Sequence, residues 1–177
     1  GEDTLSLHDA LPILLVALQA PLLALARAAG LADEVLPLAP LGGEHFDLHC
    51  SIMSLPSVLG LTLEDLPGRH WPYLQVPEAQ AARWQARLAT LPGRRVGIVW
   101  GGNPRLTKDA LRSTALADWA PVLQVPGVSF VSLQKGAPAG QLAALPYPVT
   151  DWMDECEDML ETAALISGLD LVISVDT

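Results

Sequence analysis

The sequence predicts an α/β fold with parallel strands, divided into two parts near Pro77. Short apolar runs alternate with amphipathic segments through the second part, an alternation typical of a parallel, doubly wound sheet. The run from 96 to 100 carries no charge, as expected of a strand buried on both faces. A stretch dense in proline and glycine, 51–76, precedes the boundary, and domain boundaries commonly lie in such stretches.

Before Pro77 the expected order is strand, helix, strand, strand. Pro21 suits the first position of a helix, and Gly30 is expected to stop it. Apolar runs predict short strands at 14–18, 35–38 and 46–49, followed by a helix or turn at 55–59. This order corresponds to an incomplete βαβ unit.

After Pro77 the pattern is more regular. The expected elements are helix 78–91, strand 95–100, helix 116–124, strand 128–133, a short strand at 149–152, helix 159–167 and a buried strand at 171–175. Trp84 and Leu88 are expected on the buried side of the first helix. The last helix is expected to face the sheet with Leu160, Ala163, Ala164 and Ile166. Strands 95–100, 128–133 and 171–175 are predicted to be parallel members of one sheet.

Composition, charge and motifs exclude several classes of protein. The 177 residues carry a formal net charge of −10, which argues against general nucleic-acid binding. Cys50 and Cys156 match no metal or redox spacing, so free thiols in a reducing, cytoplasmic setting are expected. No apolar run reaches the roughly 18 residues of a transmembrane helix, and neither metal nor cofactor is expected. The chain also lacks the dinucleotide-binding, P-loop and serine-hydrolase motifs.

One loop reverses the sign of the charge locally. Five of the chain's ten Lys and Arg residues fall between Arg94 and Arg112, where only Asp109 opposes them. The basic loop, with Arg105, Lys108 and Arg112, follows the predicted buried strand after Gly101 and Gly102. Open α/β sheets bind anionic ligands at the carboxyl ends of their strands. The alternative is a solvated surface loop.

Three turns are expected to converge at that edge of the sheet. They are 101–108, 134–136 and Asp176-Thr177, which together supply glycines, cations and a hydroxyl for a phosphate. Alternatively, Lys135 is a solvated turn lysine and Asp176 a helix N-cap. The acidic cluster at 151–161 matches no calcium-loop spacing, so a solvated helix start is expected there.

The first residues have a different origin. Residues 4–13, TLSLHDALPI, resemble the codon-for-codon translation of a common short-read sequencing adapter. Residues 1–13 are therefore expected to be an artefact that contributes nothing to the fold, and His8 and Asp9 are set aside with them. The chain is expected to be a fragment, truncated at both ends.

Several motifs together resemble one enzyme family. VGIVWGGNP at 96–104, the Arg112-Ser113 pair, FVSLQKG at 130–136 and TAALISGLDLVISVDT at 162–177 look like the nucleotide-sugar-binding half of bacterial glycosyltransferases of the heptosyltransferase-like type (family nine). FDLHCSIMSLP at 46–56 is similar to such domains at the C-terminus of tetratricopeptide-repeat proteins. The resemblance covers 14–177 and implies a GT-B-like architecture, two Rossmann-like domains with parallel sheets. Residues 14–77 would then belong to the acceptor-side domain and 78–177 to the nucleotide-sugar-binding domain.

The resemblance also implies a reaction and a binding site. A sugar would pass from a nucleotide diphosphate sugar to an acceptor hydroxyl, which requires positive charge on the leaving diphosphate and a base. The implied nucleotide-sugar contacts are Gly102, Asn103, Lys108, Arg112, Ser113, Gln134, Lys135, Asp176 and Thr177.

The candidates for the base are Asp47 and His49, and the alternative for each is a structural role at the end of a strand that packs inward. The family's helix after the Asp-Thr pair and its acceptor-side glycine-rich loop are absent, and no tetratricopeptide repeat is present. The fragment alone is therefore expected to be inactive. The alternative function is a non-catalytic binding or scaffold domain.

Overall fold

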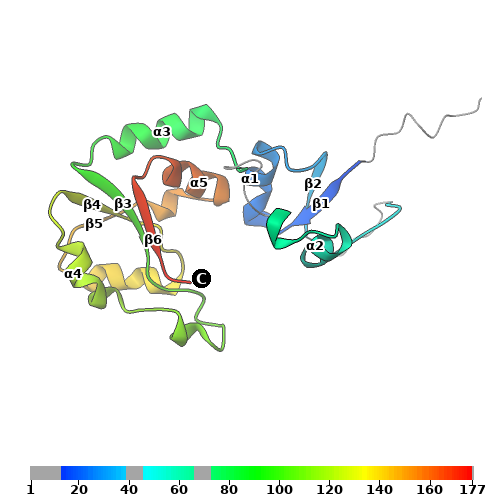
Figure 1. Cartoon of the computed structure of the whole chain (residues 1–177). Helices are drawn as coiled ribbons and strands as arrows, with labels where there is room; N and C mark the ends of the chain where they lie inside the picture. Colours follow the sequence, from blue (N-terminus) through cyan, green and yellow to red (C-terminus); the bar gives the residue numbers. More distant parts are fainter. Residues whose placement is uncertain (1–12, 39–45, 66–72, 177) are drawn as a thin grey trace, which may run out of the picture. The chain divides into compact units, whose positions relative to one another are not determined.

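The computed structural model describes residues 13–38, 46–65 and 73–176. The chain divides into two compact units, 1–75 and 76–177, and each contains a sheet of parallel strands (Figure 1). The predicted α/β, Rossmann-like class is therefore confirmed. Among the described residues, no helix has the length and apolar character required to span a membrane.

The first unit contains a small parallel sheet. Strands β1 (Leu15–Leu18) and β2 (Glu34–Pro37) pair in parallel, and the 3-10 helix η1 (Ala20–Leu22) and helix α1 (Leu23–Ala28) connect them. Gly30 follows the helix with a φ of 60°, a conformation that glycine adopts without strain. The predicted strand–helix–strand order is confirmed here.

The predicted strand at 46–49 is wrong. The segment forms no ladder, and Leu48 is 90% exposed. An alternating sequence becomes a strand only when a neighbouring strand supplies backbone partners and a covered face, and no described strand supplies them here. Three short helical turns follow at η2 (Ile52–Ser54), α2 (Leu55–Val58) and η3 (Leu63–Asp65).

The second unit has a four-stranded sheet in the order β5-β4-β3-β6. Its strands are β3 (Arg94–Val99), β4 (Val128–Ser132), β5 (Val149–Asp151) and β6 (Leu171–Ser174). All three neighbouring pairs are parallel. The prediction that the three longer strands lie parallel in one sheet is confirmed, so their carboxyl ends lie at one edge.

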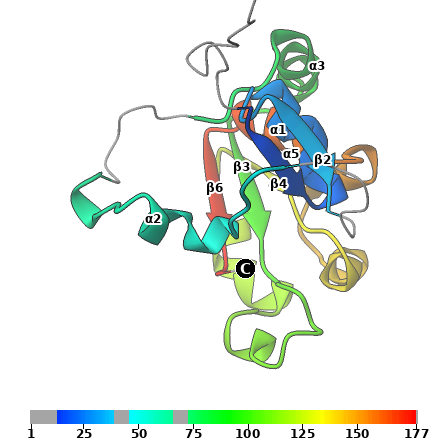
Figure 2. The ribbon, with the colours of Figure 1, turned by 90° about the vertical axis from the view of Figure 1, so that its right-hand side faces the viewer.

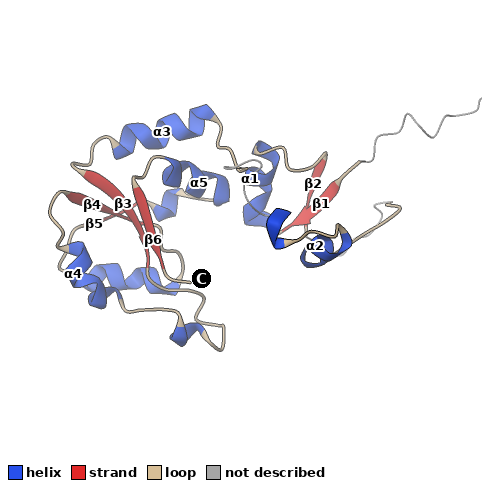
Figure 3. Ribbon diagram, in the orientation of Figure 1, coloured by secondary structure: helices blue, strands red, loops and turns tan. Residues whose placement is uncertain are grey.

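Helices cover both faces of this sheet (Figure 3). Helices α3 (Glu78–Leu88) and α5 (Met159–Ser167) pack on one face through a cluster that includes Trp84, Leu88 and Val131. The other face is covered by η5 (Leu116–Trp119), α4 (Ala120–Leu123) and η6 (Ala137–Ala144), against Ile98 and Phe130. Val131 and Phe130 face opposite ways because side chains alternate along a strand.

Two predictions about the last elements are wrong. Strand β6 pairs only with β3 and lies at the edge of the described sheet, so Leu171 and Val172 are 53% and 39% exposed rather than buried. On α5, Ile166 is 39% exposed, whereas the buried positions are Thr162, Ala164 and Leu165. Apolar composition does not distinguish a central strand from an edge strand.

The acidic cluster has a structural role. Glu161 and Glu155 form ion pairs with Arg83 and Arg87 of α3, and the Arg87 guanidinium also lies 4.5 Å from the centre of the Trp152 ring. These contacts join α3 to α5 and to the segment before it. The prediction of a helix start whose acidic side chains interact only with solvent is therefore wrong for Glu155 and Glu161, which form ion pairs.

Asp158, in the same cluster, is the N-cap of α5. Its Oδ1 accepts a hydrogen bond from the Glu161 backbone N at 3.0 Å. In the described ranges, no three metal-binding side chains come together.

Candidate functional site

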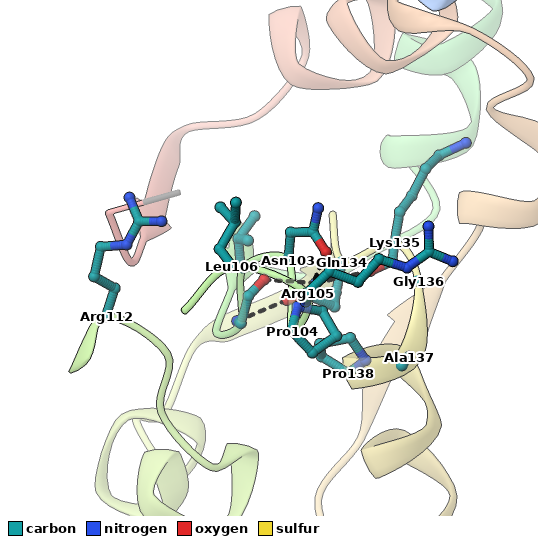
Figure 4. Close-up of a pocket in the computed structure, with 13 residues that line it drawn as sticks. Asn103, Pro104, Arg105, Leu106, Arg112, Gln134, Lys135, Gly136, Ala137 and Pro138 are labelled. Atoms are coloured by element: carbon teal, nitrogen blue, oxygen red, sulfur yellow. Dashed lines mark hydrogen bonds between the residues drawn. The ribbon is translucent and has the colours of Figure 1, made fainter. Parts of the chain in front are cut away.

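A hollow lies at the carboxyl ends of β3 and β4. Its volume is about 620 Å³, and its lining comes from residue 99, residues 101–106, Arg112 and residues 134–138 (Figure 4). Two of the three predicted turns therefore meet here. The hollow lies at the edge where open α/β sheets bind their ligands.

The first turn leaves β3 sharply. A Cβ on Gly101 would lie 2.9 Å from Cβ and Cγ of Pro138. Glycine therefore lets the backbone pass this close to the Pro138 ring. Asn103 then makes a tight turn, because its Oδ1 accepts from the Arg105 backbone N at 3.0 Å and its carbonyl accepts from the Leu106 backbone N at 3.0 Å. These bonds hold Arg105 at the mouth of the hollow.

The basic loop is tied at its base. The Gly102 backbone N donates to Oγ of Ser113 at 2.8 Å. The backbone N and Oγ1 of Thr114 both donate to the Trp100 carbonyl, at 2.8 and 3.1 Å. Residues 103–112 therefore project beyond the sheet from a fixed base (Figure 2). Ser113 and the Gly102 amide, predicted to contact the nucleotide, bond to each other.

Gln134 is buried at the end of β4, with 3% exposure. Its Oε1 accepts from the backbone N of Trp100 at 3.1 Å and from that of Gly101 at 2.9 Å. Its Nε2 donates to the carbonyls of Gly101 and Lys135, at 2.8 and 2.9 Å. All four hydrogen-bonding positions of the amide are occupied. The predicted contact of this side chain with a nucleotide would require breaking one of these bonds.

Lys135 points away from the hollow. Its Nζ donates to the carbonyl of Cys156, which links the turn after β4 to the segment before α5 (Figure 4). Lys135 is an exposed turn residue that borders the hollow, and its ammonium is engaged by this backbone carbonyl, so its contact with an anion stays a prediction. Burial of Cys156 raises the pKa of its thiol, so it remains protonated at neutral pH.

Two arginines line the hollow. In Figure 4, Arg112 approaches beside the end of β6, and Arg105 lies across the hollow from it. Nη1 of Arg112 is 3.9 Å from Oδ2 of Asp176, a weak and exposed ion pair, and its buried Nε has no partner within the described chain. In the same ranges the guanidinium of Arg105 has no bonded partner. Arg105 is absent from the predicted contacts, although its place in the basic loop was a usable signal.

Lys108 lies outside this hollow. It lines a second hollow of about 560 Å³ on the basic loop, together with Leu106, Thr107, Leu111 and Arg112. Of the residues that the structure describes, Leu106 and Arg112 border both hollows. Thr177, the remaining predicted contact, lies outside the described residues.

The two candidate bases belong to the first unit. Asp47 and His49 are both exposed, and the His49 ring makes an edge contact with Phe46 at 5.6 Å between ring centres. The expectation that they end a strand packed against the interior is wrong. The described residues that line the hollow all belong to the second unit, and a role of Asp47 or His49 as the base stays a prediction.

Comparison with known proteins gives one partial similarity. No family model matches the chain, and no solved structure matches it. Protein FlbA of Caulobacter vibrioides is 34% identical over 137 residues, covering 73% of this chain but 23% of FlbA. The chain therefore spans less than a quarter of the curated protein it matches.

Proposed function

We propose that the second unit binds the diphosphate of a nucleotide diphosphate sugar, as the donor-binding part of a glycosyltransferase that acts on an acceptor hydroxyl. The observation that supports this is the hollow at the carboxyl edge of a parallel sheet, lined by Arg105 and Arg112 in a chain with a net charge of −10. Positive charge on an otherwise acidic protein favours an anionic ligand locally.

The chemistry of sugar transfer fits these two side chains. When the bond from the sugar to the diphosphate breaks, negative charge builds up on the leaving phosphate. Guanidinium groups can donate two parallel hydrogen bonds to phosphate oxygens, and they stabilise that charge without a metal. Arg105, with no bonded partner in the described ranges, and Arg112, held only weakly by Asp176 at 3.9 Å, are available for such contacts.

The dimensions fit as well. A volume of about 620 Å³ is within the range of small-molecule sites and exceeds what a diphosphate alone requires. Val99, Ala137 and Pro138 give the hollow apolar walls beside its charged mouth. Lys108, on the neighbouring hollow, adds to the local positive potential.

Isothermal titration of the 177-residue chain with nucleoside diphosphates tests the proposal. Charge-assisted hydrogen bonds contribute about 1.5–3 kcal/mol each, so Arg105→Ala or Arg112→Ala is expected to weaken binding by about tenfold or more. Arg94→Ala is the matched control, because it removes the same charge from an exposed position at the opposite end of β3. It is expected to leave the affinity nearly unchanged.

Titration with the corresponding nucleosides separates the possible outcomes. The arginine variants are expected to change nucleoside affinity little, since a nucleoside lacks the phosphates. If the folded chain binds no nucleoside diphosphate, the donor-binding proposal fails and a non-catalytic scaffold domain becomes the better account. If Arg94→Ala weakens binding as much as Arg105→Ala, the hollow is not the site.

A further inference from the structure

The Gln134 side chain makes hydrogen bonds of the kind that the backbone of a strand residue would make. The β4·β3 ladder ends where the Leu133 backbone N donates to the Ile98 carbonyl at 3.0 Å. Beyond that point Gln134 bonds to Trp100 and Gly101 of the departing chain, and Gly101 is bonded through both its N–H and its carbonyl. The hydrogen bonds of one side chain thus continue to connect the two chain segments beyond the ends of both strands.

This extension fixes where the basic loop begins. Gly101 passes against Pro138, and the next residue, Gly102, is tied to Ser113 at 2.8 Å. Without Gln134, the N–H groups of Trp100 and Gly101 would lose their partners inside the protein, and an unsatisfied buried amide is costly. The chain would have to shift to satisfy them, and the loop bearing Arg105 would shift with it.

We infer that Gln134 is a positioning residue of the anion-binding hollow, rather than a group that touches the ligand. It sets the path of the chain from Trp100 to Gly102 and so the distance between Arg105 and Arg112 across the hollow. The ligand's identity rests on the proposed function, whereas the positioning of the loop does not.

Gln141 provides a matched control. Its Oε1 also accepts from a backbone amide, that of Leu116, at 2.7 Å, but it does not line the hollow. A glutamine that only stabilises the fold behaves like Gln141. Gln134→Met and Gln141→Met each replace an amide with an uncharged side chain of similar length, at a buried position in the first variant and at an exposed one in the second.

The first experiment is amide hydrogen exchange on the full chain, without ligand. In Gln134→Met, the amides of Trp100 and Gly101 are expected to exchange at least about tenfold faster, the effect of losing roughly one hydrogen bond each. Amides within β3 and in Gln141→Met at the same two positions are expected to be unchanged. Unchanged protection of Trp100 and Gly101 in Gln134→Met would overturn the inference whether or not a ligand binds.

The second experiment is titration with inorganic diphosphate, at a temperature where both variants are folded. Gln134→Met is expected to weaken binding by about tenfold, because small displacements of charged groups have large effects on affinity. Gln141→Met is expected to bind as the unmodified chain does. Equal affinities in all three proteins would overturn the inference, whereas no binding even by the unmodified chain would count against the proposed function alone.

Gln134→Glu covers the case in which Gln134→Met does not fold. Its carboxylate keeps both acceptor bonds but cannot donate to the carbonyls of Gly101 and Lys135. Trp100 and Gly101 are expected to stay protected, and diphosphate affinity is expected to fall and to recover as the pH is lowered and the carboxyl gains a proton that it can donate. Loss of that protection at high and low pH alike would contradict the role assigned to the amide oxygen.

Discussion

Gly93 and Gly127 meet in the two turns that lead into β3 and β4. Their φ angles are 70° and 75°, in the region that favours glycine. A Cβ on Gly93 would lie 2.1 Å from the Gly127 carbonyl oxygen, whereas a Cβ on Gly127 would have nothing within 4 Å. The two glycines therefore share a backbone conformation, but there is space for a Cβ at Gly127 and none at Gly93.

This difference predicts the order of two destabilising substitutions. Gly127→Ala is expected to cost about 1–2 kcal/mol, the conformational penalty of a left-handed residue. Gly93→Ala adds a clash with backbone, which cannot rotate away, and is expected to cost clearly more. Urea denaturation of both variants measures the difference. Equal losses of stability in the two variants would mean that the turns can move apart and relieve the clash at Gly93 without a cost in free energy.

At the scale of elements, charged and aromatic side chains join α3 to α5. The Trp84 ring is fully buried, and its Nε1 donates to Oε2 of Glu161 at 2.8 Å. Hydrogen bonds from Arg87 hold the pKa of Glu155 below its ordinary value. A carboxylate with a lowered pKa in the folded state stabilises the fold above its ordinary pKa, and this contribution is lost as the pH falls below that value.

The pH dependence of this contact can be measured by replacing Glu155. Glu155→Gln is expected to lower stability at pH 7, and the deficit is expected to shrink as the pH falls below the ordinary pKa of a glutamate and through the lowered pKa of Glu155. Glu157→Gln is the control, because Glu157 is exposed and forms no ion pair within the described ranges. Denaturant melts from pH 3 to pH 7 compare the two variants. A deficit that does not change with pH would show that the ion pair contributes nothing.

At the scale of the whole molecule, the two units differ in how much they bury. The two hydrophobic clusters that hold the four-stranded sheet lie entirely within the second unit. In the first unit the buried apolar residues are Leu25, Ala26 and Val35 among those described. A two-stranded sheet with so small a core is marginal by itself.

Residues 76–177 are therefore expected to fold alone. The isolated segment should unfold cooperatively and with nearly the same midpoint as the 177-residue chain, because both hydrophobic clusters consist of its own residues. Residues 1–75 alone are expected to show no cooperative transition. Circular dichroism during heating tests both segments, and a non-cooperative melt of 76–177 would show that its core depends on the rest of the chain.

Local signals in the sequence were sufficient for most of the second unit. Apolar runs bounded by turn residues located β3, β4, β5 and β6. Their alternation with helices predicted a parallel arrangement, since parallel strands are joined by long crossover connections that usually contain a helix. The basic loop and the turn after β4 were placed at one edge for the same reason. These features depend on residues close together in the chain.

The tertiary structure alone decided what the side chains at that edge do. Gln134, Lys135 and Ser113 have the chemistry of phosphate ligands, but in the fold they bond to backbone groups up to 34 residues away. Arg105 borders the hollow at the carboxyl ends of β3 and β4, whereas Lys108, three residues later, lines a different hollow. Residue type determines which bonds a side chain can make, and the packed fold determines which partners are within reach.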